Sequence, residues 1–93
     1  MANMSASKSQ ERRNRVEPRL LPFGPLTEIV PSTATVRIEL PLTGATLRQE
    51  ILSAYPELRE RRFRVAVDRR LAGDEGMITE AGEIALLPPF AGG

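Results

Sequence analysis

Residues 83–93 read EIALLPPFAGG, and this stretch says most about how the chain folds. Its first part, residues 84–87, is apolar on both faces of a period-two pattern, which is typical of a strand buried in the middle of a sheet. The two prolines that follow fix φ and keep the chain extended. The last two residues are glycines, which leave a slender, flexible main-chain carboxylate. The stretch therefore predicts a central strand, a stiff spacer and a presented carboxyl group.

The composition excludes most forms of autonomous catalysis. The chain has no Cys and no His, so it has no thiol nucleophile, disulfide or imidazole base. A metal would have to be held by carboxylates alone, and the twelve Asp and Glu residues do not show the spacing of a ligand loop. We therefore expect no bound metal or cofactor and no active site of the chain's own. If the protein takes part in chemistry, it does so as a substrate or a carrier.

Length and charge indicate one small domain. A chain of 93 residues with 41% hydrophobic content holds a single core, built here mainly from Leu, Ile and Val. The net charge of +1 does not favour nucleic acid, and no apolar run approaches the roughly 18 residues of a membrane helix. Residues 1–15 lack the apolar region of a signal peptide. We expect a disordered tail at 1–15, a domain at 16–89, a flexible tail at 90–93, and a cytoplasmic protein that is monomeric when free.

Hydrophobic patterning predicts a series of short elements between the two tails. Residues 46–49 (TLRQ) fit a capping box, which makes Thr46 the N-cap of the main helix. Residues 35–40 alternate apolar and polar side chains and could form an antiparallel hairpin with residues 19–23. In order, the predicted elements are a strand at 19–23, a helical turn at 26–30, a strand at 35–40, the helix at 46–55, a strand at 63–68, an edge strand at 71–72 and the last strand at 84–87.

This order of elements fits an α+β fold with one mixed sheet. One main helix is available to cover a face of the sheet. The last strand takes a central position because it is apolar on both sides, and the first strand lies beside it in parallel. This is the β-grasp, or ubiquitin-like, architecture, here followed by a flexible diglycine tail.

The whole pattern resembles the MoaD/ThiS family of sulfur carriers, and within it the MoaD branch. The resemblance covers residues 16–93. Its most specific part is the succession of Gly82-Glu83, an apolar strand, Pro88-Pro89 and Gly92-Gly93. ThiS-like carriers also end in diglycine but usually lack the two prolines. The other matching segments are FGPL at 23–26, ATLR at 45–48 and VAVD at 65–68.

The resemblance implies a mechanism that needs no side-chain nucleophile. An E1-like adenylyltransferase uses ATP to adenylate the carboxylate of Gly93, and sulfur then replaces AMP to give a thiocarboxylate. The carrier inserts its tail into the large subunit of molybdopterin synthase or an analogous sulfur acceptor. In the MoaD branch, two such donations convert cyclic pyranopterin monophosphate into molybdopterin, on the way to the molybdenum cofactor. ATP is used by the activating partner and is not bound by the carrier.

The resemblance also implies roles for individual residues. Gly93 carries the sulfur, and Gly92 gives clearance in the partner's channel. The other implied site residues contact the partner: Phe23, Leu71, Leu87, Pro88, Pro89, Phe90 and Ala91. Leu87 reads equally well as a core residue. The turn at 68–70 (DRR) replaces an Asn-containing turn common in the family, and residues 1–15 have no counterpart there.

Other functions stay open on the sequence. The same tail suits a sulfur carrier for thiazole, cysteine or a secondary metabolite. It also suits a ubiquitin-like modifier that is joined to lysines through Gly93; Lys8 is the single lysine of this chain. A non-catalytic β-grasp interaction module is the remaining alternative. The six arginines within residues 59–70 form either a solvated face or a docking surface for an acidic partner.

Overall fold

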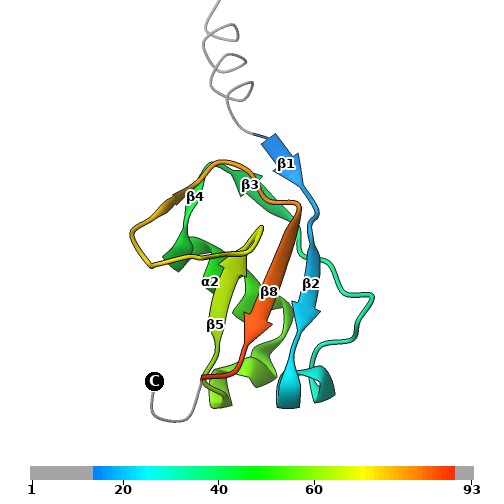
Figure 1. The fold of residues 1–93 in the computed structure, drawn as a ribbon. Helices are drawn as coiled ribbons and strands as arrows, with labels where there is room; N and C mark the ends of the chain where they lie inside the picture. The colour runs from blue at the N-terminus through cyan, green and yellow to red at the C-terminus, as the bar shows by residue number, and fades with distance from the viewer. Residues whose placement is uncertain (1–13, 90–93) are drawn as a thin grey trace, which may run out of the picture.

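The structure is a computed structural model that describes residues 14–89, and Figure 1 shows their arrangement. One main helix, two short 3₁₀ helices and eight short strands follow one another in this part of the chain. They are β1 (Asn14–Val16), β2 (Arg19–Pro22), η1 (Gly24–Glu28), β3 (Ile38–Leu40), β4 (Leu42–Thr43), α2 (Gly44–Ala54), η2 (Pro56–Glu60), β5 (Arg64–Val67), β6 (Arg70–Leu71), β7 (Met77–Ile78) and β8 (Glu83–Leu87).

The largest sheet has four strands in the order β2-β8-β5-β6 (Figure 1). Strand β8 pairs in parallel with β2, where Leu20 faces Ile84, and antiparallel with β5, where Val65 faces Leu86. A strand with neighbours on both edges can pair its backbone N–H and C=O groups on both sides within the sheet. This central position suits residues 84–87, whose side chains are all apolar. The central position of the last strand and its parallel pairing with residues 19–22 are both confirmed.

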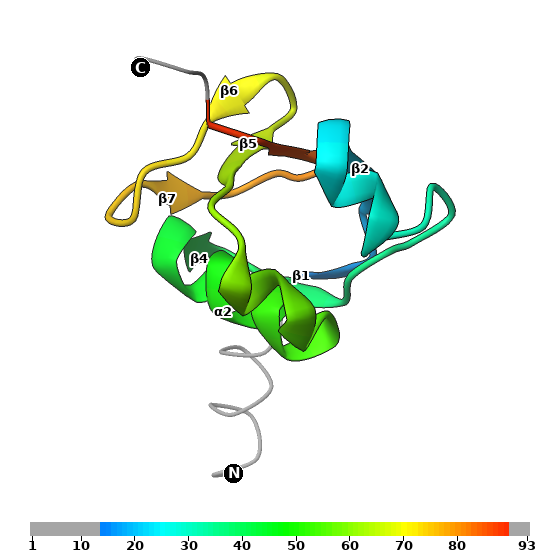
Figure 2. The same cartoon turned by 90° about the horizontal axis from the view of Figure 1, so that it is seen from below.

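The core lies between this sheet and α2, which face each other in Figure 2. Leu47 and Ile51, one helical turn apart, are completely buried on the helix. Leu20, Ile84 and Leu86 are completely buried on the facing side of the sheet. Arg48 fastens the helix to the segment before β5: its guanidinium donates to the carbonyl oxygen of Phe63 at 2.7 Å and stacks on the Phe63 ring. A mixed sheet packed on one main helix is the α+β, β-grasp arrangement that the sequence predicts.

The helix begins earlier than the capping box at 46–49 indicates. Its N-cap is Thr43, whose hydroxyl oxygen accepts a hydrogen bond from the backbone N–H of Thr46 at 3.2 Å, so the prediction of Thr46 as the N-cap was wrong. Strand β4 pairs with β7 and brings the chain to the helix in an extended conformation. The first helical turn then packs so closely on a loop that a Cβ at Gly44 would overlap the carbonyl oxygen of Gly73. Gly44 permits this contact, and the pairing of β4 sets the start of the helix.

The predicted hairpin between residues 19–23 and 35–40 was also wrong in its main pairing. Strand β3 pairs with β1, where Asn14 faces Leu40 and Val16 faces Ile38. Strand β2 meets the region before β3 at a single bridge between Arg19 and Thr35. Residues 14 and 15 thus belong to a strand and not to a disordered tail. Hydrophobic patterning does not predict this strand because both side chains are polar. Strand β1 is held by backbone pairing with β3 and by the exposed ion pair between Arg15 and Glu39.

Candidate functional site

The tail leaves the domain at one end of β8, beside the end of β2 (Figure 1). The N–H of Phe23 donates to the carbonyl oxygen of Leu86 at 3.0 Å and so continues the parallel pairing by one residue. Gly24 follows in a left-handed conformation, with φ of +61°, and lies against Pro88: a Cβ at Gly24 would be 3.2 Å from the proline ring. Pro88 is half-buried and Pro89 is exposed. The base of the tail is therefore held by packing on the turn after β2.

Phe90, Ala91, Gly92 and Gly93 lie outside the described residues. The roles that the sequence assigns to them stay predictions. What the structure shows is the end of β8 and the two prolines that precede them in the chain.

The register of the sheet sorts side chains onto its two faces. On β8, Ile84 and Leu86 belong to the core, so Ala85 and Leu87 between and after them point to the outer face, away from α2. Ala85 faces Leu21 on β2 and Ala66 on β5, and Ala66 in turn faces Leu71 on β6. One row across all four strands is therefore apolar.

A second row lies next to the first, at the end of the sheet from which the tail leaves. Leu87 faces Arg64 on β5, and Phe23 lies beside Leu87 on its other flank. Phe23 is 48% exposed and Leu71 is 61% exposed, whereas Leu87 is half-buried. We call the apolar members of the two rows the apolar face: Leu21, Phe23, Ala66, Leu71, Ala85 and Leu87.

The apolar face brings together three residues that the sequence singled out from different strands. Phe23, Leu71 and Leu87 lie on one side of the sheet and outside the buried core. Leu87 was equally readable as core, and the pairing with Arg64 places it on the outer face. Whether a partner contacts them stays a prediction. Exposed apolar side chains gathered on one face are the usual mark of an interaction surface.

Sequence reasoning missed the smaller members of this face and one exposed methionine. Ala66 and Ala85 read as core because they lie inside apolar runs, and only period-two alternation anchored on Ile84 could have assigned them. Met77 on β7 is 63% exposed and lies opposite Thr43 of β4, outside the four-stranded sheet. It therefore does not belong to the apolar face.

Asp68 fixes the start of β8 against the end of β5. It occupies the first position of a two-residue turn with φ of 48°, and Arg69 follows with φ of 74°. Such left-handed pairs are typical of tight hairpins, and Asp accepts this conformation more readily than Arg. The Asp68 carboxylate accepts hydrogen bonds from the backbone N–H groups of Gly82 at 2.9 Å and Glu83 at 3.0 Å. These bonds align β8 and hence the tail that follows it.

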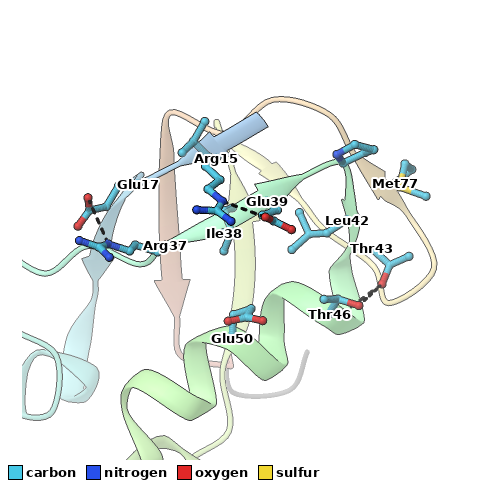
Figure 3. Close-up of a pocket in the computed structure, with 12 residues that line it drawn as sticks. Arg15, Glu17, Arg37, Ile38, Glu39, Leu42, Thr43, Thr46, Glu50 and Met77 are labelled. Carbon is cyan, nitrogen blue, oxygen red and sulfur yellow. Dashed lines mark hydrogen bonds and ion pairs between the residues drawn. The ribbon is translucent and has the colours of Figure 1, made fainter. Parts of the chain in front are cut away.

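A groove of about 840 Å³ lies apart from the apolar face, and Figure 3 shows the residues that line it. It runs over β1, β3, β4 and the start of α2. Four of its five charged residues pair with one another: Arg15 contacts Glu39 at 3.0 Å, and Arg37 contacts Glu17 at 3.9 Å. Within residues 14–89, no cluster of three carboxylates could hold a metal, and no helix is long and apolar enough to span a membrane.

Comparison with known proteins decides the family. The model of the ThiS family matches residues 21–93, which include the end of β2, the apolar face and the diglycine tail. The chain is a member of the ThiS family. A likeness to a solved structure, the crystal structure of SAMP1 from Haloferax volcanii, has a TM-score of 0.61 at 23% identity. It covers 84% of this chain and all of that one, and it supports the β-grasp fold. No curated protein sequence gave a match.

Membership in the ThiS family gives the surface a context. ThiS-family proteins are ubiquitin-like sulfur carriers, and they generally act with E1-like activating enzymes and sulfur acceptors. The candidate site of this ThiS-family protein is the apolar face together with the two prolines that follow β8 at its edge.

Proposed function

We propose that this ThiS-family protein carries sulfur as a thiocarboxylate on Gly93 and donates it in molybdopterin synthesis. The observation that carries the proposal is the geometry of the tail base. The tail leaves β8 at the edge of an apolar face that is exposed at Phe23 and Leu71. A partner that covers this face therefore receives the tail directly.

The proposed chemistry uses the terminal carboxylate in two balanced steps. In the activating enzyme, a carboxylate oxygen of Gly93 attacks the α-phosphorus of ATP, and pyrophosphate leaves. Hydrosulfide then attacks the carbonyl carbon of the acyl-adenylate, AMP leaves with the bridging oxygen, and the proton on sulfur passes to solvent. The product is a thiocarboxylate. Gly92 leaves room for the reacting atoms in a narrow channel, since it has no side chain to exclude.

The role of the folded domain in this chemistry is to position the C-terminal tail for the partner. Pro88 packs on the turn after β2, and the ring of Pro89 fixes its own φ, so the two prolines stiffen the base of the tail. Phe90 and Ala91 would then pass the mouth of the partner's channel. Burial of Phe23, Leu71 and Leu87 in the complex supplies binding free energy, while the tail supplies the reacting group.

The choice of molybdopterin as the destination rests on the sequence around the tail. The succession of Gly82-Glu83, an apolar strand, two prolines and a diglycine resembles the MoaD branch. The structure gives the prolines a physical role, because one of them packs on Gly24 and stiffens the exit. A sulfur carrier for another acceptor and a protein modifier share the same tail, and the test below separates them.

The test is a sulfur-transfer reaction with defined components. The loaded carrier is mixed with the large subunit of a molybdopterin synthase and cyclic pyranopterin monophosphate. We expect the dithiolene product to form while the carrier returns to the mass of its free carboxylate. A variant that lacks Gly93 should fold normally and give no product.

Other outcomes would redirect the proposal. A loaded carrier that keeps its sulfur in this reaction, yet releases it to an enzyme of thiazole or cysteine synthesis, would replace molybdopterin as the destination. Isopeptide adducts on lysines of other proteins, formed without sulfur transfer, would show a protein modifier instead.

A further inference from the structure

Arg64 is the one charged residue in the two rows that form the apolar face. It lies on β5 directly opposite Leu87, the last residue of β8 before the prolines. Its side chain is exposed, and within residues 14–89 it takes part in no ion pair and no side-chain hydrogen bond. Among residues 14–89, therefore, no side chain pairs with this cation, which lies beside the point where the tail leaves the domain.

Strand pairing does not place the other five arginines of the 59–70 segment on the outer face. Arg62 and Arg69 lie outside the strands. Arg61 contacts Glu28 at 3.9 Å. Arg59 lies on η2, outside the sheet. Arg70 faces the core residue Val67 across the β5–β6 pair and so belongs to the opposite face of the sheet. The segment is thus not one basic patch, and the register selects Arg64 alone for the apolar face.

The far end of the outer face is different in charge. There Arg19 on β2 faces Glu83 on β8, so that opposite charges adjoin. The outer face therefore has opposite charges at facing positions at one end, an apolar middle, and at the tail end a guanidinium that faces an apolar residue on β8. This asymmetry gives a partner a means of telling the two ends apart.

Docking on the apolar face would remove water from Arg64. A guanidinium that loses water without gaining a partner opposes binding strongly, whereas one that meets a carboxylate in a bidentate contact adds specificity. We propose that Arg64 is a partner-selecting residue: it pairs with an Asp or Glu of the E1-like activating enzyme, next to the mouth of the channel that receives the tail. The pair would fix the rotation of the carrier on its partner, so that the tail points into the channel. This inference rests on the proposed function.

The experiment measures binding of the full chain to its cognate E1-like enzyme. Three variants are compared with the wild type by calorimetry at low and high salt: Arg64→Glu, Arg64→Gln and Arg59→Glu. Arg59→Glu is the matched control, because it makes the same change of charge at an exposed position outside the sheet. Circular dichroism and urea unfolding check that each variant is folded.

We expect Arg64→Glu to weaken binding by about 30-fold or more, as for truncation or reversal of a close interfacial charge pair. Arg64→Gln should lose less, and its affinity should depend less on salt than that of the wild type. Arg59→Glu should stay within about twofold, because an exposed charge outside the apolar face acts through a screened field.

Several results would overturn the inference. Equal effects of Arg64→Glu and Arg59→Glu, with sulfur loading of the wild type intact, would refute the role of Arg64 and leave the proposed function standing. A wild-type dimer in sedimentation that dissociates on Arg64→Glu would assign the face to a second copy of this chain. Failure of the wild type to bind or to be loaded by any E1-like enzyme would remove both the inference and the function on which it rests.

Discussion

Replacement of Leu71 by Ala should separate binding from folding. Leu71 lies on the edge strand β6 and is 61% exposed, so folding buries only the smaller part of its side chain. Full burial of a leucine contributes about 1.5–3 kcal/mol, and the exposed share leaves about 1–2 kcal/mol for docking. That free energy corresponds to a loss of about 5- to 30-fold in affinity for the activating enzyme. The free energy of unfolding should fall by less than about 1 kcal/mol.

The matched control is Leu86→Ala, the same change on the other face of the sheet. Leu86 is completely buried in the core, so its truncation should cost about 2–5 kcal/mol of unfolding free energy. The folded fraction of that variant should still bind with the wild-type affinity. Binding is measured by calorimetry and stability by urea unfolding. Unchanged binding of Leu71→Ala, or a loss of stability as large as that of Leu86→Ala, would refute the assignment of the apolar face.

Three further changes test the local geometry. Gly44→Ala should lower the unfolding free energy by about 1–3 kcal/mol in urea titrations, because the new Cβ would overlap a carbonyl oxygen. Gly73→Ala is the control and should have little effect, because there is open space around this residue. Equal effects of the two changes would contradict the close packing at Gly44. Arg69→Gly should raise the unfolding free energy by about 0.5–1 kcal/mol. Glycine relieves the strain of the left-handed backbone, and this gain exceeds the extra conformational entropy that glycine gives to the unfolded chain. A lower thermal midpoint would mean that the arginine side chain makes stabilising contacts. Asp68→Ala should cost about 1–3 kcal/mol and speed hydrogen exchange of the two amides at the start of β8, and unchanged exchange there would refute the anchoring role.

The central strand and its surroundings could be predicted from the sequence. A short run that is apolar on both faces is buried on both faces only in the middle of a sheet, and the two prolines after it mark the end of the strand. The same reasoning predicted the parallel first strand. The family resemblance, and not the hydrophobic pattern, singled out Phe23 and Leu71 as partner contacts. Both are exposed in the structure.

Features set by backbone pairing could not be predicted from side-chain patterns. Strand β1 has polar residues at 14 and 15 and is recognisable only once β3 is in place beside it. The helix cap moved from Thr46 to Thr43 because the pairing of β4 with β7 delivers the chain to that point. Both residues are good N-caps by type, so propensity alone does not choose between them.

The candidate site was predictable in its parts and not in its arrangement. Arg64 looks like one of six arginines in the sequence, and only its register opposite Leu87 places it on the apolar face. Ala66 and Ala85 lie inside apolar runs of the sequence, and only the pairing of their strands places them on this face. Sequence spacing gives the side of a strand to which a residue points, but the pairing of strands decides which residues become neighbours.

The central claim is that Gly93 is the point at which sulfur is loaded. The most direct measurement is the intact mass of the chain after incubation with its E1-like enzyme, ATP and a sulfur source. A positive control shows that the enzyme preparation loads a known carrier. The account predicts a mass increase that corresponds to the replacement of one oxygen by sulfur, located at Gly93 by fragmentation and absent in the variant that lacks this residue. An unchanged mass with an enzyme that loads the control carrier would contradict it.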